Sequence, residues 1–123
     1  MRQKILIVDD EHDLVEATAL RLEKAGYEVV RAYDAKAAIE AVSREKPDLI
    51  LLDHRLPQSS GLGLLEMFKS FGSAMLTPVV LMTASIDDDI RKKALAAGAA
   101  DFIAKPFSGE ELLKTIARIL EKK

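Results

Sequence analysis

Five short apolar runs, each followed by a longer amphipathic stretch, set the pattern of this chain. The runs are expected to form strands at residues 4–8, 27–33, 48–53, 78–82 and 101–104. The central run is apolar from Leu49 to Leu52, which is typical of a strand covered on both faces of a parallel sheet. It stops at a carboxylate, Asp53. Ligand crevices in open α/β sheets lie outside the carboxyl ends of the strands, so position alone makes Asp53 a candidate site residue.

Each amphipathic stretch predicts a helix with one apolar face turned to the sheet. The predicted inward faces are Leu14, Thr18, Leu22 and Ala25; Ala35, Ala38, Ile39 and Val42; Leu64, Leu65 and Phe68; Ile90, Ala94 and Ala97; and Leu112, Leu113, Ile116 and Leu120. The acidic triplet at 87–89 is expected to cap the fourth helix. Ser108, with Glu111 three residues later, is expected to form a capping box for the last one.

The alternation of five strands and five helices predicts the architecture. An α/β fold is expected, a (βα)5 doubly wound parallel five-stranded sheet of flavodoxin-like type with helices on both faces. The common strand order for such a chain is 2-1-3-4-5. A chain of 123 residues is one domain of ordinary size, so residues 1–123 are expected to form a single domain without a second one.

Composition narrows the functional classes. The longest apolar run is far shorter than the roughly 20 residues of a membrane helix, and the absence of cysteine excludes disulfides and thiolate metal sites. We expect no membrane association, no signal peptide and a cytoplasmic location. The net charge is −2, from 18 basic and 20 acidic residues, without a dense basic cluster. Direct binding of nucleic acid is therefore not expected.

The predicted strand order brings polar residues from four strand ends into one crevice. Asp9 and Asp10 follow the first strand, Asp53 ends the third, Thr83 the fourth and Lys105 the fifth. Three neighbouring carboxylates need a cation unless one of them is protonated, and oxygen ligands with open water positions favour Mg²⁺. With a lysine and a hydroxyl beside it, such a site suits phosphorylation of Asp53. Each residue also has a structural explanation: Asp10 as a helix cap, Thr83 as a strand former and Lys105 as an edge charge.

The chain resembles the receiver domain of two-component response regulators over essentially its whole length. The matching motifs are Val8-Asp9-Asp10, Asp53-His54-Arg55-Leu56-Pro57 followed by Gly61, Thr83-Ala84, and Lys105-Pro106-Phe107. The resemblance implies that Asp53 is the phosphoacceptor. It implies that Asp9 and Asp10 bind Mg²⁺ together with Asp53 and the backbone carbonyl of Arg55. It further implies that Thr83 and Lys105 hold the phosphoryl oxygens, and that the Lys105–Pro106 bond is cis.

The resemblance also implies a switch and partners. Phe102 would be the switch aromatic, at a position where tyrosine is frequent, and without a hydroxyl its ring must be held by packing. Leu56 stands where methionine is frequent, a near-isosteric exchange. The phosphoryl donor would be a sensor histidine kinase or a phosphotransfer protein. The target would be a downstream protein or a fused output domain, contacted through the fourth helix, fifth strand and fifth helix, and a phosphorylation-dependent dimer is a further expectation. Catalysis would be limited to self-phosphorylation and self-dephosphorylation.

Two other classes of protein compete with this interpretation. A Mg²⁺-dependent phosphatase with an aspartyl nucleophile would use Asp53 in the same way. Enzymes that resemble the haloacid dehalogenase family, however, carry a second aspartate two residues later, where this chain has Arg55. A flavodoxin-type cofactor binder is disfavoured because Asp9 and Asp10 would repel a phosphate. His12 and His54 lie near the site, but their spacing does not suit a metal site and they are expected to be exposed.

Overall fold

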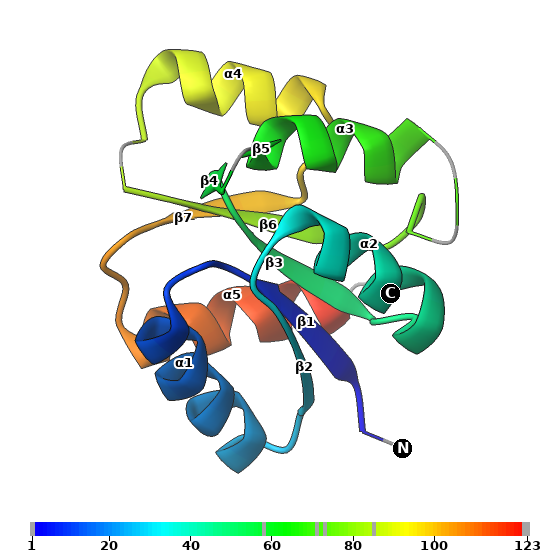
Figure 1. Ribbon diagram of the computed structural model, residues 1–123. Helices are drawn as coiled ribbons and strands as arrows, with labels where there is room; N and C mark the ends of the chain where they lie inside the picture. Colours follow the sequence, from blue (N-terminus) through cyan, green and yellow to red (C-terminus); the bar gives the residue numbers. More distant parts are fainter. Residues whose placement is uncertain (1, 58, 71, 73, 85, 122–123) are drawn as a thin grey trace.

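The computed structural model describes residues 2–57, 59–70, 72, 74–84 and 86–121, which form a parallel sheet with helices on both faces (Figure 1). The strands of this sheet are β1 (Lys4–Val8), β2 (Glu28–Ala32), β3 (Leu49–Asp53), β6 (Val79–Thr83) and β7 (Asp101–Ala104). The helices are α1 (His12–Lys24), α2 (Ala35–Glu45), α3 (Gly61–Ser70), α4 (Asp88–Ala96) and α5 (Gly109–Glu121). Where a loop was expected, β4 (Arg55–Leu56) and β5 (Ser59–Ser60) form a short antiparallel pair.

The strand order of the large sheet is β2-β1-β3-β6-β7, and every neighbouring pair is parallel. Leaving out the short pair, this is the order 2-1-3-4-5 along the chain. The predicted doubly wound (βα)5 fold is therefore confirmed for the described residues. The order places β1 beside β3 at the centre, where the chain reverses its winding direction and where such folds bind ligands.

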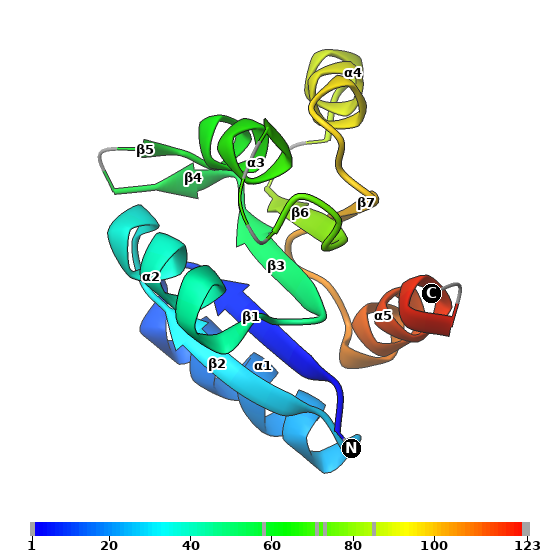
Figure 2. The same cartoon turned by 90° about the vertical axis from the view of Figure 1, so that its right-hand side faces the viewer.

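Two hydrophobic clusters hold the helices on the sheet. Figure 2 shows α1 and α5 on one face and α2, α3 and α4 on the other. Alternate positions of β3 serve the two faces: Ile50 and Leu52 belong to the cluster under α2, α3 and α4, whereas Leu49 and Leu51 belong to the cluster under α1 and α5. All five residues of β3 are buried, as expected for a strand covered on both sides. Full burial of one such side chain contributes about 1.5–3 kcal/mol to folding.

Two predicted helix faces need correction. The buried residues of α1 are Val15, Thr18, Ala19 and Leu22. Leu14 is only half-buried, and Ala25 is exposed because the helix has already ended at Lys24. On α2, Ile39 was predicted to face inward but is 43% exposed, and Ala41 is buried instead. Apolar residues flank both stripes, so helical periodicity alone fixes the buried face only to within about one position.

Asp87, the first residue of the acidic triplet, and Ser108 cap α4 and α5 as predicted, but only one of the two bonds of the expected capping box is found among the described residues. Asp87 Oδ1 accepts a hydrogen bond of 2.8 Å from the Ile90 backbone N–H at the start of α4. Ser108 Oγ accepts one of 3.0 Å from the Glu111 backbone N–H at the start of α5. These bonds satisfy amide groups that have no partner inside the helix. They also fix where the loops before α4 and α5 end, and both loops border the site described below.

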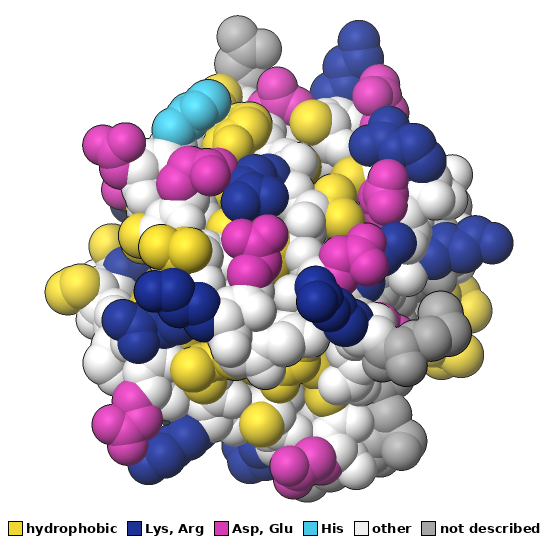
Figure 3. Space-filling model, turned by 90° about the horizontal axis from the view of Figure 1, so that it is seen from below, with side chains coloured by type: hydrophobic (Ala, Val, Ile, Leu, Met, Phe, Trp, Pro, Cys, Tyr) yellow, Lys and Arg dark blue, Asp and Glu magenta, His cyan; other side chains and the backbone are white. Residues whose placement is uncertain are grey.

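The outer surface carries charges of both signs. On the side where α1 and α5 lie, acidic and basic side chains alternate with apolar ones (Figure 3). Among the described residues, no helix combines the length and the apolar character needed to span a membrane.

Candidate functional site

The carboxyl ends of the parallel strands are level with one another at one edge of the sheet. Val8 is paired with Leu52, Asp53 with Met82, and Thr83 with Ala104. Pairing continues beyond the last strand, because the Lys105 backbone N–H donates a 2.8 Å hydrogen bond to the Thr83 carbonyl. This register places Asp9 next to Asp53, and Lys105 one residue beyond the partner of Thr83. The predicted convergence of these side chains is confirmed.

Three carboxylates meet at this edge. Oxygen atoms of Asp9, Asp10 and Asp53 all lie within 4.8 Å of one another. Asp9 is fully buried and Asp53 is 6% exposed, whereas Asp10 is open to solvent. Asp10 is not the cap of α1: the N-cap residue is Glu11, whose own backbone N–H donates a 3.0 Å hydrogen bond to Asp9 Oδ1. The structural explanation of Asp10 therefore does not hold, and its carboxylate remains available to a ligand.

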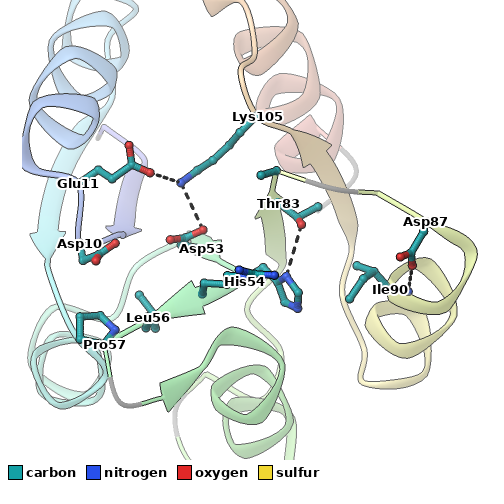
Figure 4. A pocket seen from close by; sticks show the side chains of 12 residues that line it. Asp10, Glu11, Asp53, His54, Leu56, Pro57, Thr83, Asp87, Ile90 and Lys105 are labelled. Carbon is teal, nitrogen blue, oxygen red and sulfur yellow. Dashed lines mark hydrogen bonds and ion pairs between the residues drawn. The ribbon is translucent and has the colours of Figure 1, made fainter.

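The ammonium group of Lys105 lies among the carboxylates (Figure 4). Its nitrogen is 2.7 Å from Asp9 Oδ2, 3.3 Å from Asp53 Oδ1 and 3.2 Å from Glu11 Oε1. The peptide bond between Lys105 and Pro106 is cis, as the resemblance implied. The contact with Glu11 was not anticipated from the sequence. The sequence feature that could have indicated this contact is the third acidic residue of the run, Glu11, directly after Asp10.

Burial and charge shift the pKa values at the site. Burial, followed by the charge of Asp9, raises the pKa of the Asp53 carboxyl, and Lys105 opposes this rise only in part. Burial alone would lower the pKa of Lys105. The hydrogen bond to Asp9 and the charge of Asp53 outweigh burial, so the pKa of Lys105 is raised. Lys105 is therefore charged at neutral pH.

Thr83 and His54 form the opposite wall of the cleft. Thr83 is 1% exposed, and its hydroxyl oxygen lies 3.4 Å from His54 Nδ1. His54 is half-buried, which corrects the expectation of an exposed side chain, and burial followed by the charge of Arg55 lowers its pKa. His12 is exposed as expected, with its ring stacked on Tyr33 at a centroid distance of 3.9 Å. Neither histidine belongs to the carboxylate cluster.

Around these residues lies an open cleft of about 540 Å³. Its lining comes from the loops after β1, β3, β6 and β7 and from the start of α4, namely Asp10, Glu11, Asp53, His54, Arg55, Leu56, Pro57, Thr83, Ala84, Asp87, Ile90 and Lys105. A volume of this size holds a phosphoryl group and several waters, each of which takes about 30 Å³. Phe102 lies outside this cleft, half-buried on β7.

The donor set fits a hard divalent cation. Asp9 is buried, and its Oδ2 already faces the positive charge of the Lys105 ammonium group at 2.7 Å, so the surroundings of this oxygen suit a cation. Two further carboxylates lie within reach, and one of them, Asp10, faces solvent. Oxygen ligands that leave positions for water suit Mg²⁺ better than Ca²⁺. Arg55 lines the same cleft, and its backbone is hydrogen-bonded to the Asp53 carboxylate.

Known proteins resemble this chain in sequence and fold. The sequence pattern of the response regulator receiver domain matches residues 5–117. The phosphate regulon transcriptional regulatory protein PhoB of Pseudomonas aeruginosa is 40% identical over 118 residues, which are 96% of this chain and 52% of that protein. This chain thus spans about half the length of the curated relatives it matches.

Solved structures agree with the sequence comparison. The chemotaxis protein CheY4 of Vibrio cholerae superposes with a TM-score of 0.91 at 29% identity, over 96% of this chain and 98% of that one. The receiver domain of the sensor histidine kinase PA1611 of Pseudomonas aeruginosa, which has a magnesium ion coordinated in its active site cleft, gives a TM-score of 0.88 at 29% identity, over 98% of this chain and 99% of that one. The match spans all the strand ends that form the cleft. This chain belongs to the response regulator receiver domain family of two-component phosphorylation signalling.

Proposed function

We propose that Asp53 is the phosphoacceptor and that the reaction needs Mg²⁺ bound by Asp9, Asp10, Asp53 and the backbone carbonyl of Arg55. The observation that carries this proposal is the meeting of three carboxylates with one lysine at the ends of β1, β3 and β7. A bound Mg²⁺ would offset the charge of the incoming phosphoryl group. Support also comes from PA1611, a receiver domain with magnesium in its cleft.

The chemistry at Asp53 is a phosphoryl exchange. A carboxylate oxygen of Asp53 forms a bond to phosphorus while the phosphorus–nitrogen bond of a phosphohistidine, or the phosphorus–oxygen bond of a small acyl phosphate, breaks. Lys105 offers a fixed positive charge to one phosphoryl oxygen, and the Thr83 hydroxyl can donate to another. Self-dephosphorylation removes the phosphoryl group again by hydrolysis: water attacks phosphorus, the bond to Asp53 breaks, and inorganic phosphate leaves.

Phosphorylation would act on partners through the surface formed by α4, β7 and α5, with Thr83 and Phe102 as the link. Charge-assisted hydrogen bonds contribute about 1.5–3 kcal/mol each, so Thr83 and Lys105 together would supply roughly 3–6 kcal/mol. Moving a two-state equilibrium from 1:99 to 99:1 takes about 5.5 kcal/mol. A switch is therefore attainable, with little margin. The partner that binds this surface would be an output domain or a separate protein. A second copy of the chain, in a phosphorylation-dependent dimer, is a further candidate.

The donor side is a histidine kinase or a phosphotransfer protein, as for receivers in general. An aspartyl phosphatase, the alternative considered from the sequence, is not favoured, because the family match covers residues 5–117 and Arg55 occupies the position of the second aspartate. A cytoplasmic location stays a prediction.

Intact-mass spectrometry with a small acyl phosphate tests the proposal. We expect one added phosphoryl group, which disappears in Asp53→Asn and on removal of Mg²⁺ by a chelator. Asp88→Asn is the matched control, because Asp88 is exposed on α4 and should leave the adduct unchanged. An adduct that persists in Asp53→Asn would refute the assignment of the phosphoacceptor.

Amide NMR spectra with and without beryllium fluoride test the switch. We expect shift changes along residues 86–120 in addition to those around Asp9, Asp53 and Lys105. Thr83→Ala should still accept a phosphoryl group yet lose most of the distant changes, because it keeps the nucleophile and removes the donor. Changes confined to the three loops would leave a phosphorylation site without this output surface.

A further inference from the structure

The ring of Phe102 makes a cation–π contact with an arginine. Phe102 is half-buried on β7, where it packs against the cluster under α2, α3 and α4. The guanidinium carbon of Arg91, on α4, lies 4.8 Å from the centroid of this ring. A cation at this distance over an aromatic face is held by the negative charge of the π system. Phe102 therefore has a specific partner although it lacks a hydroxyl.

Arg91 has no competing carboxylate partner within the described part of the chain. The ion pairs of α4 join Lys93 to Asp89, whereas Arg91 enters none. Arg91 is exposed, and its guanidinium lies over the Phe102 ring. An exposed cation–π contact changes an equilibrium constant by about two- to fivefold.

Phe102 lies on the same side of the sheet as Thr83. It is paired with Leu81, and Thr83 stands two residues after Leu81 on the same strand. Side chains two residues apart on a strand share a face. If the Phe102 ring moves along this face toward Thr83, it must give up its cation–π contact with Arg91.

We infer that Arg91 is a positioning residue that holds the Phe102 ring in its observed place under the guanidinium and thereby opposes loading of the phosphorylation site. The inference rests on the proposed roles of Asp53, Thr83 and Phe102. It extends them by naming the group that replaces the missing hydroxyl. The Arg91–Phe102 contact would exist only in the unloaded conformation and would favour that conformation by some factor. By linkage, it weakens binding of a phosphoryl mimic by the same factor. Loading in turn frees the Arg91 guanidinium on the α4 surface.

The test is a titration with beryllium fluoride in the presence of Mg²⁺, followed by fluorine NMR. Arg91→Met removes the charge and keeps most of the side-chain length, and it should bind the mimic about two- to fivefold more tightly than the wild type. Lys92→Met is the matched control: Lys92 is the exposed neighbour of Arg91 on α4, the cation over the ring is Arg91, and loss of Lys92 should leave affinity unchanged. In a Phe102→Leu background, Arg91→Met should have no effect.

Ring proton shifts of Phe102 give a second readout that does not depend on the mimic. They should change in Arg91→Met and stay unchanged in Lys92→Met. Unaltered or weaker binding by Arg91→Met, or an equal gain in the Phe102→Leu background, would overturn the role of Arg91 while the wild type still binds. Failure of the wild type itself to bind would overturn the proposed function, and this inference with it.

Discussion

The Lys105 ammonium nitrogen lies closer to Asp9 Oδ2, at 2.7 Å, than to Asp53 Oδ1, at 3.3 Å. Lys105 therefore neutralises the buried carboxylate of the proposed metal site at least as much as it neutralises Asp53, the proposed phosphoacceptor. A divalent cation on Asp9 and a phosphoryl group on Asp53 would both change the partners of this one side chain. Lys105 thus couples the two parts of the site electrostatically.

The first prediction concerns Mg²⁺ affinity. In Lys105→Met, Asp9 loses its cationic partner and the cluster keeps its negative charge, so Mg²⁺ should bind more tightly. A unit positive charge about 4 Å from a divalent ion repels it by about 2 kcal/mol even at the dielectric of bulk water, so we expect a gain of about tenfold or more when that charge is lost. Isothermal calorimetry measures the affinity.

Lys114→Met is the control for this prediction. Lys114 is 76% exposed and pairs with Glu110 at 3.0 Å on α5, far along the chain from the carboxylate cluster. Its replacement makes the same change in net charge and should leave Mg²⁺ affinity unaltered. An equal gain in both variants would mean that net charge, and not the Lys105–Asp9 pair, governs the affinity.

The second prediction concerns stability and pH. Burial and the charge of Asp9 raise the pKa of Asp53 in the folded chain, so the fold favours its protonated form. Ionised Asp53 therefore lowers the free energy of unfolding. This loss is absent below the unfolded-state pKa of about 3.9, grows as pH rises from there through the raised folded-state pKa, and remains at neutral pH. Asp53→Asn should therefore raise the free energy of unfolding at about pH 7, in the presence of a chelator.

Urea denaturation at several pH values tests this sign. The gain in Asp53→Asn should shrink as pH falls toward about 4, because the wild-type carboxyl then takes up its proton. Asp88→Asn, at an exposed position, should show no comparable gain. A variant at position 53 that is less stable than the wild type at neutral pH would contradict the prediction.

The site could be predicted from the sequence because the ends of parallel strands must share one edge. Once the apolar runs before Asp9, Asp53, Thr83 and Lys105 are recognised, their convergence follows from strand order alone. The contact between Glu11 and Lys105 joins residues 94 positions apart and depends on side-chain conformation, which no periodicity encodes. The same holds for Arg91 over Phe102.

The helix faces show a different limit. The apolar stripes of α1 and α2 were located, but Val15 replaces Leu14 in the buried face, and Ile39 remains exposed. A helix can rotate by a fraction of a turn over the sheet without changing its apolar pattern, and packing against neighbouring strands decides the final angle.

The third prediction separates two of the acidic residues at the start of α4, Asp87 and Asp88. Asp87→Ala removes the side-chain acceptor of the Ile90 N–H and should cost about 1 kcal/mol of stability, in the range 0.5–2. Asp88→Ala removes only a charge in the first turn, worth about 0.3–1 kcal/mol through the helix dipole. Urea midpoints should rank the two variants in this order, and the reverse order would contradict the assignment of the cap.

The last prediction concerns the glycine that follows the phosphoacceptor loop. A Cβ at Gly61 would overlap the backbone carbonyl oxygen of Asp53, and the Gly61 N–H donates a 2.8 Å hydrogen bond to the His54 carbonyl. Gly61→Ala must therefore push the start of α3 away from the end of β3. We expect a loss of about 1–3 kcal/mol in stability, as in other overpacked sites, and slower phosphorylation because Asp53 moves relative to Lys105.

Gly63→Ala provides the comparison two residues later. There the nearest atom to an added Cβ is Ser60 Oγ at 3.7 Å, an ordinary contact, and the residue is exposed within α3. Alanine favours a helix over glycine by up to about 1 kcal/mol, so this variant should gain stability and keep its phosphorylation rate. Opposite signs for the same substitution would show that close approach of α3 to the Asp53 backbone, and not a general need for glycine, fixes the phosphoacceptor loop. Equal effects at both positions would contradict this.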